Sequence, residues 1–98
     1  MTYKLLQLKK ENMRNYGFMD YDFALEHGFN EKDYEIVYEG EIDKHNLFST
    51  YEVLEALFEK FNCNRPEDFK GHSMSVSDIV VLDGTKFYCD SFGFRKID

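Results

Sequence analysis

Hydrophobic and polar residues change their spacing along the chain. Tyr3–Leu8, rich in Leu and Tyr, predicts a first strand. From Asp33 to Asp43 the two kinds of residue alternate, which is typical of a half-buried strand with one face in water. The expected inner set is Tyr34, Ile36, Tyr38 and Ile42, and the expected outer set is Asp33, Glu35, Glu39, Glu41 and Asp43. Val37 and Gly40 interrupt the pattern, and we expect Gly40 to mark a bulge or the strand end.

Two helices are predicted, one long and one short. The long helix spans about Thr50–Phe61, where Ser49 and Glu52 have the spacing of an N-terminal capping box. Its apolar face consists of Leu54, Leu57, Phe58 and Phe61. The short helix begins after Asp20, a favourable N-cap, and stops before Gly28. A helix of that length needs tertiary packing to persist.

The last third of the chain predicts a hairpin and one further strand. Asp83-Gly84 between Ile79–Leu82 and Thr85–Cys89 is a strong two-residue hairpin signal, because glycine tolerates positive φ. Phe94–Ile97 is expected to add another strand. Strands at both ends and helices between them indicate an α+β fold. It would be a small, mostly antiparallel sheet of about four to five strands, with the main helix and the short helix packed on one face, in one domain over residues 1–98.

Composition favours a folded protein and argues against several partner classes. Hydrophobic residues make up 43% of the chain and aromatic residues 17%, enough to fill one core. A net charge of −7 disfavours direct nucleic-acid binding and docking on anionic lipid, both of which need an excess of Lys and Arg. No apolar run is long enough for a signal peptide or a membrane span, so we expect a cytoplasmic protein. Cys63 and Cys89 are expected to be buried, reduced thiols.

Two segments near the C-terminus resemble a known family. They are His72-Ser73-Met74-Ser75-Val76-Ser77-Asp78-Ile79-Val80-Val81 and Phe87-Tyr88-Cys89-Asp90-Ser91-Phe92-Gly93-Phe94. Together with Tyr34-Glu35-Ile36-Val37-Tyr38-Glu39-Gly40, they are similar to the YodL-like domain, a small bacterial family, over most of the chain from Phe18 onward. The resemblance implies a gene carried on conjugative elements and phages of Gram-positive bacteria. It implies no catalytic residues.

His72, the three following serines and Asp78 include the residue types of a hydrolytic triad, which must converge in space. On an extended segment His72, Met74 and Val76 share one side, so the serines would point away from the imidazole. We therefore expect hydroxyls that bond nearby backbone and an Asp78 that orders the hairpin entry, with a polar recognition groove as the alternative. A small hydrolase that uses His72 and a nearby serine is a further, weaker alternative. The candidate binding residues are His72, Ser73, Ser75, Ser77, Asp78, Asp90 and Ser91.

Acidic residues are concentrated in one part of the chain. Residues 20–43 hold nine acidic and one basic residue, a net charge of −8. Glu35, Glu39 and Glu41, further candidate binding residues, are expected on the outer face of one strand, either as a solvated surface or as one that attracts a basic protein. An antirestriction protein that mimics DNA is the alternative. Charges on alternate strand residues lie roughly 6.6–6.8 Å apart, however, whereas DNA carries one per ~1.7 Å.

The sequence indicates neither a cofactor nor a metal site. The three histidines lack i, i+4 spacing, and phosphate-binding glycine patterns are absent. Aromatic residues near Phe18 and near Phe92 would form an interface or homodimer patch if they were exposed together. We expect a non-enzymatic interaction or regulatory module that binds an unidentified host protein through an acidic or aromatic face.

Overall fold

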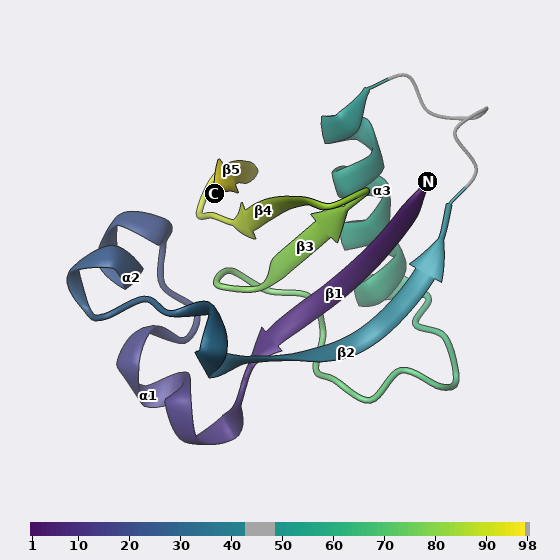
Figure 1. The fold of residues 1–98 in the computed structure, drawn as a ribbon. Helices are drawn as coiled ribbons and strands as arrows, with labels where there is room; N and C mark the ends of the chain where they lie inside the picture. The colour runs from purple at the N-terminus through teal and green to yellow at the C-terminus, as the bar shows by residue number, and fades with distance from the viewer. Residues whose placement is uncertain (43–48, 98) are drawn as a thin grey trace.

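The computed structural model describes residues 1–42 and 49–97, and its strands form one antiparallel sheet (Figure 1). The strands are β1 (Thr2–Leu8), β2 (Tyr34–Glu41), β3 (Ile79–Leu82), β4 (Thr85–Cys89) and β5 (Phe94–Ile97), in the order β2-β1-β3-β4-β5. The helices are α1 (Met13–Tyr16), α2 (Tyr21–Glu26) and α3 (Thr50–Cys63), with 3₁₀ turns at Lys10–Asn12 and Glu31–Asp33. The predicted α+β class is confirmed. No helix in the described ranges has the length and apolar character that crossing a membrane requires.

Apolar side chains are buried on both faces of the sheet, because successive strand residues point to opposite sides. The cluster on the α3 face, with α3 behind the sheet in Figure 1, contains Tyr3, Leu5, Val53, Leu54, Leu57, Phe61, Met74, Val80, Leu82 and Phe87. The cluster on the opposite face, here the short-helix face, contains Leu8, Tyr16, Ala24, Tyr34, Ile79, Tyr88 and Ile97. The main helix and the short helix were expected on one face. The short helix α2 instead covers the second apolar surface, through Ala24.

Local capping signals set where the helices begin. The Asp20 carboxylate accepts a hydrogen bond from the Phe23 N–H at 2.8 Å, which starts α2. The Ser49 hydroxyl accepts one from the Glu52 N–H at 3.2 Å, which starts α3. Both predicted N-termini are confirmed, and α3 runs two residues beyond the predicted Phe61.

The hairpin between β3 and β4 also forms where predicted. Its turn residues, Asp83 and Gly84, have φ values of 47° and 86°. Two positive φ angles in a two-residue loop match the twist of the flanking strands. The Asp83 carboxylate further accepts a hydrogen bond from the Thr2 N–H at 2.8 Å, which ties the hairpin to β1.

The irregularity in β2 lies at Val37 and not at Gly40. Leu5 pairs with Tyr38 whereas Leu6 pairs with Ile36, so Val37 is the extra residue of a bulge. Gly40 continues the strand and has a different role. A Cβ at that position would lie 2.8 Å from the Tyr3 hydroxyl oxygen, so only glycine leaves room for the aromatic ring.

The bulge overturns the expected single acidic face, because one extra residue moves the side chains beyond it to the other side. Glu35 pairs with Gln7 and lies on the α3 face. Glu39 and Glu41 lie on the short-helix face. Ile36, expected to be buried, is 51% exposed. Asp43, the last residue of the predicted strand, lies outside the described residues.

Candidate functional site

Three segments meet at the end of the sheet toward which β1 points in Figure 1. They are residues 17–20 between α1 and α2, residues 71–78 before β3, and residues 90–93 between β4 and β5. The antiparallel topology places the end of β1, the start of β3 and the end of β4 side by side. We call these three segments together the loop end. Seven of the predicted candidate residues lie in it, brought together by the fold.

Residues 72–78 form a loop and not the extended segment that the sequence suggested. The chain turns at Val76-Ser77, and Ser77 has a φ of 87°, so the expected alternation of sides does not occur. Met74 is buried while His72 is exposed. The loop is ordered from within by side-chain oxygens.

The hydrogen bonds to backbone that were predicted for the serine hydroxyls and Asp78 are present at Ser75, Ser77 and Asp78. The Ser75 hydroxyl donates to the Ser73 carbonyl at 2.8 Å. Asp78 Oδ2 accepts from the Ser75 N–H at 2.9 Å. The hydroxyl and the carboxylate thus replace the ladder partners that a strand would have supplied.

Gln7, which the sequence analysis did not single out, joins this loop to β1. Its side chain is 2% exposed. Nε2 donates to the His72 carbonyl at 2.8 Å and to Asp78 Oδ2 at 3.0 Å, while Oε1 accepts from the His72 N–H at 3.1 Å. The available signal was a single amide within the otherwise apolar run Leu5-Leu6-Gln7-Leu8. A polar side chain in a buried strand needs partners, and here another segment supplies them.

Asp78 is a buried carboxyl group at the centre of the loop end, only 1% exposed. Burial raises its pKa from 3.8 to about 7, while the hydrogen bonds from Ser75 and Gln7 act in the opposite direction. Near neutral pH the group therefore exchanges between its protonated and ionised forms. The hydrogen bonds that it accepts strengthen when it carries charge.

The His72 ring bonds to backbone and lies beside an exposed aromatic residue. Nδ1 lies 2.7 Å from the Ser73 carbonyl oxygen, an acceptor, so we assign the proton to Nδ1. The ring centroid lies 5.7 Å from that of Phe18. In the described part of the chain, no hydrogen bond joins the imidazole to a serine hydroxyl or to Asp78. His72, the serines and Asp78 are therefore neighbours without the relay geometry of a triad.

Phe18 has an unusual conformation for an aromatic residue. Its φ is 64°, in the left-handed region that bulky residues avoid, and its side chain is 57% exposed. The Phe18 N–H donates to the Ser77 hydroxyl at 3.0 Å. Ser77 also has positive φ, and its carbonyl accepts a hydrogen bond of 2.6 Å from the Tyr34 hydroxyl. Buried contacts thus hold both residues in place, and Phe18 points outward.

Asp90 and Ser91 form the third segment of the loop end. Asp90 Oδ1 accepts from the Ser91 N–H at 2.9 Å and from the Tyr21 N–H at 3.3 Å, which connects the turn to α2. The turn carries Phe92 at its tip, and that side chain is 99% exposed.

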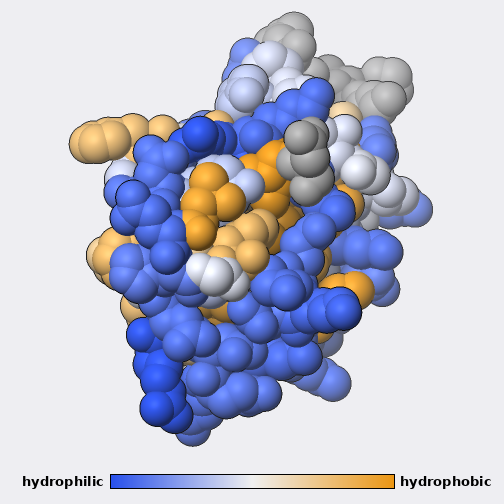
Figure 2. All heavy atoms as spheres, turned by 60° about the vertical axis from the view of Figure 1, so that its left-hand side comes forward, coloured by the Kyte–Doolittle hydropathy of each residue, from blue (hydrophilic) through white to orange (hydrophobic). Residues whose placement is uncertain are grey.

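Figure 2 shows apolar residues gathered in a small patch within a largely hydrophilic face. The large exposed apolar residues are Phe18, Met19, Leu25, Ile36, Tyr51 and Phe92.

Comparison with known protein families shows to which family the chain belongs. Residues 2–98 match the YodL-like domain. The chain belongs to the YodL-like domain family. The resemblance seen in the sequence from Phe18 onward is thereby confirmed and extends to the N-terminal strand. No curated protein and no solved structure gives a significant match.

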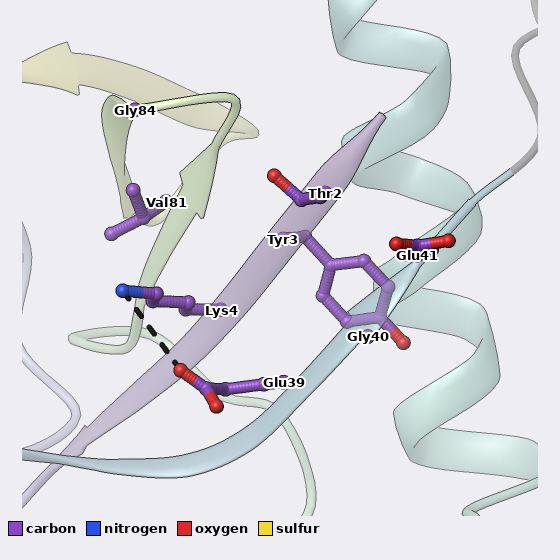
Figure 3. Close-up of a pocket in the computed structure, with 8 residues that line it drawn as sticks. All are labelled: Thr2, Tyr3, Lys4, Glu39, Gly40, Glu41, Val81 and Gly84. Carbon is purple, nitrogen blue, oxygen red and sulfur yellow. Dashed lines mark ion pairs between the residues drawn. The ribbon is translucent and has the colours of Figure 1, made fainter.

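Glu35 lies beside the loop end, where it lines a hollow with Gln7 and His72. The other two acidic candidates of this YodL-like domain, Glu39 and Glu41, lie further along β2. Beside them is an open hollow of about 550 Å³ on the sheet (Figure 3). It is lined by Thr2, Tyr3, Lys4, Glu39, Gly40, Glu41, Val81 and Gly84. Glu39 points toward Lys4, at 3.9 Å, and both side chains are more than half exposed. An exposed pair of this length contributes little stability, so the carboxylates are available to another molecule.

The cysteines of the YodL-like domain differ from each other. Cys89 is buried, and burial raises the pKa of its thiol to about 12, which suppresses the reactive thiolate. Cys63, predicted to be buried, is exposed because it ends α3. Within residues 1–42 and 49–97, no group of three or more His, Cys, Asp or Glu side chains is placed to hold a metal ion.

Proposed function

We propose that this YodL-like domain is a non-enzymatic interaction module, carried by a mobile element, that binds a protein of the bacterial host through its loop end. The observation that carries the proposal is the conformation of Phe18. An aromatic residue that is held on a left-handed backbone by a hydrogen bond to buried Ser77 costs stability, and its side chain, 57% exposed, buries only part of its surface in the monomer. Such an arrangement is typical of an anchor residue for a partner.

The surroundings of Phe18 support a protein partner. His72 lies against its ring, and fully exposed Phe92 lies in a neighbouring segment of the loop end. Aromatic residues are enriched at protein interfaces, where they bury much area at a low entropic cost. Phe18 and Phe92 therefore supply two apolar anchors, with the exposed polar residues His72 and Ser91 beside them.

Hydrogen bonding supports a binding role over hydrolysis. The Ser75 hydroxyl donates to a carbonyl, and the Ser77 hydroxyl accepts from the Phe18 N–H. Asp78 is engaged by Gln7 and Ser75 and does not orient His72. A nucleophile needs a base within hydrogen-bond reach, and these serines have other partners. Labelling of Ser73 or Ser75 by a fluorophosphonate probe would restore the hydrolase alternative.

DNA mimicry gains no support from the arrangement of charge. It requires a dense, continuous row of carboxylates. The bulge at Val37 separates Glu35 from Glu39 and Glu41, which lie on the other face. If the three were nevertheless such a row, charge reversal at all of them would abolish inhibition of a restriction enzyme.

The proposal is tested by substituting Phe18 without disturbing its backbone. Asparagine tolerates left-handed φ, so Phe18→Asn removes the aromatic ring and keeps the chain path. Tagged wild-type domain is used to capture proteins from a Gram-positive host lysate, and retained proteins are identified by mass spectrometry. Binding of the identified protein is then measured directly with each variant. We expect Phe18→Asn to weaken that binding at least tenfold.

The matched control is Tyr51→Asn, which removes an aromatic side chain of similar exposure, 52%, from the start of α3. We expect this variant to bind like the wild type. Equal binding by all three proteins, or retention of nothing above background, would refute the proposed function.

A further inference from the structure

β2 is an edge strand whose outer backbone groups can be assigned from its pairing with β1. Met1 and Ile42 exchange two backbone hydrogen bonds, of 2.9 and 2.8 Å. Bonded and non-bonded positions alternate along an antiparallel ladder. Glu41 and Glu39 therefore direct their N–H and C=O groups away from β1.

The other end of β2 gives a consistent result. The Lys9 N–H donates to the Asp33 carbonyl at 2.8 Å, so Asp33 faces β1 while Tyr34 and Ile36 face outward. The extra residue of the bulge, Val37, explains why even-numbered residues face outward before it and odd-numbered residues face outward after it. Among the described residues, no other strand pairs with this outer side. The outward backbone groups are those of Tyr34, Ile36, Glu39 and Glu41.

The side chains of these four residues share the short-helix face, because residues with the same hydrogen-bonding direction point to the same side. Ile36 is 51% exposed, and Glu39 and Glu41 are exposed. A strand added along β2 would place its own side chains opposite them, about 4.5–5.5 Å away at the Cβ atoms. Those side chains would meet two carboxylates and one apolar residue, next to the hollow in Figure 3.

A second copy of this chain is a poor occupant of the edge. Parallel pairing of β2 with its own copy, or antiparallel pairing centred on Gly40, would bring the Glu39 and Glu41 side chains of both copies together, and like charges on neighbouring strands are destabilising. Antiparallel pairing over the whole of β2 would still place Glu39 of one copy diagonally across from Glu39 of the other. Pairing with β5, the four-residue edge that carries Arg95 and Lys96, would be head-to-tail and would give a ring or an open filament of many copies instead of a pair. Charge complementarity therefore favours an extended basic segment of a different protein.

We propose that the outer edge of β2 binds such a segment by strand addition, with Lys or Arg side chains opposite Glu39 and Glu41. Backbone hydrogen bonds to the outward groups provide the pairing, and the carboxylates select for basic residues. The inference rests on the proposed function in one respect, that the partner is a protein. It uses a surface separate from the loop end, so the two can fail independently.

The test uses an eight-residue peptide of alternating Lys and Val and follows backbone amide exchange by NMR. On binding, exchange of the Ile36, Glu39 and Glu41 amides should slow by at least about tenfold, because they become hydrogen-bonded. The Tyr38 and Gly40 amides, which face β1, should change little. Binding without new protection at the outward amides would overturn the proposal.

Two controls separate strand addition from general charge attraction. The same peptide with alternate backbone nitrogens methylated keeps its charge and loses hydrogen-bond donors, and we expect no binding. Glu39→Lys/Glu41→Lys should weaken binding of the unmodified peptide at least tenfold more than Glu55→Lys/Glu59→Lys, an equal charge change on exposed α3 positions. Equal losses in the two double variants, or binding of the methylated peptide, would refute the edge site.

Further outcomes distinguish this inference from the proposed function. Protection of the outward amides that rises with protein concentration, without peptide, would assign the edge to a second copy and overturn the proposal. Phe18→Asn should leave peptide affinity unchanged. Host-protein binding that is lost in Phe18→Asn and peptide binding that fails at the edge would retain the proposed function and remove the inference.

Discussion

The loop end and the β2 edge both carry polar side chains, but they use them in opposite ways. Ser75 and Asp78 of the loop end, and Gln7 of β1 beside it, form their hydrogen bonds inside the protein. In the described ranges, no buried side-chain nitrogen or oxygen lacks a partner. Along β2, by contrast, Glu39 and Glu41 are exposed beside outward backbone groups. Residue type alone does not distinguish the two regions; burial and pairing do.

A cluster of polar residues in the sequence is therefore not by itself a catalytic or binding site. The His-Ser-Ser-Ser-Asp segment drew attention as a possible reaction centre, and its groups mainly hold a loop in place. The segment also helps to hold Phe18, because the Ser77 hydroxyl accepts a hydrogen bond from the Phe18 N–H. The β2 edge has a plainer sequence. Across residues 1–42 and 49–97, no strand pairs with its outer side, which makes it the more open surface.

The largest loss of stability is expected when the Gln7 side chain is removed. Gln7→Ala removes three hydrogen bonds, one to the buried Asp78 carboxyl and two to partly buried backbone groups of His72. Leaving buried polar groups without partners is costly, so we expect the free energy of unfolding to fall by about 3–5 kcal/mol. Urea denaturation followed by circular dichroism measures this. A loss below about 1 kcal/mol would mean that the loop end is not held by this side chain.

The second prediction is that Asp78 makes the free energy of unfolding depend on pH. Its folded pKa of about 7 lies above the ordinary 3.8, so the fold favours the protonated form. The stabilising contribution is complete below the unfolded value and is lost as pH rises through the folded value. Asp78→Asn does not titrate, so its stability relative to wild type should increase by about 2–3 kcal/mol between pH ~5 and ~8. Parallel pH profiles of the two proteins would contradict it.

The third prediction concerns backbone strain at Phe18. Asparagine at this left-handed position should raise the free energy of unfolding by about 0.5–1 kcal/mol, even while partner binding falls. Phe92→Asn makes the same chemical change at a position without positive φ, and we expect no change in stability there. Thermal melts of both variants provide the measurement. Destabilisation by Phe18→Asn would show that the ring contributes to packing.

The smallest effect is expected at the β2 edge. Lys4→Ala removes the 3.9 Å pair with Glu39, and both partners are exposed. Exposed pairs contribute little, so the change should stay within about 0.5 kcal/mol. Urea titration, as for Gln7→Ala, measures this change in the free energy of unfolding for a second position of β1. A loss comparable to that of Gln7→Ala would erase the difference between the two regions.

Elements with local signals were predictable from the sequence. Asp20 and Ser49 cap helices because their side chains reach N–H groups only three residues away. Asp83-Gly84 makes its turn because positive φ is a property of those two residues. The positions of the strands followed from apolar composition, from the alternation in residues 33–43 and from the hairpin turn. Together these signals were sufficient for the α+β class.

Features that depend on distant pairing were not predictable. The bulge at Val37 exists only relative to the register with β1, and it decides on which face Glu35 lies. The partners of Gln7 lie 65 and 71 positions further along the chain, so neither its burial nor its role could be inferred from its neighbours.

The elements, their caps and the family could be inferred from the amino-acid sequence alone, because they depend on short-range chemistry and on residue identity. Only the tertiary structure decided that Phe18 is held outward by Ser77 and that the carboxylates of β2 divide between two faces. Exposure and register arise from contacts between segments far apart in the chain, and no local pattern contains them.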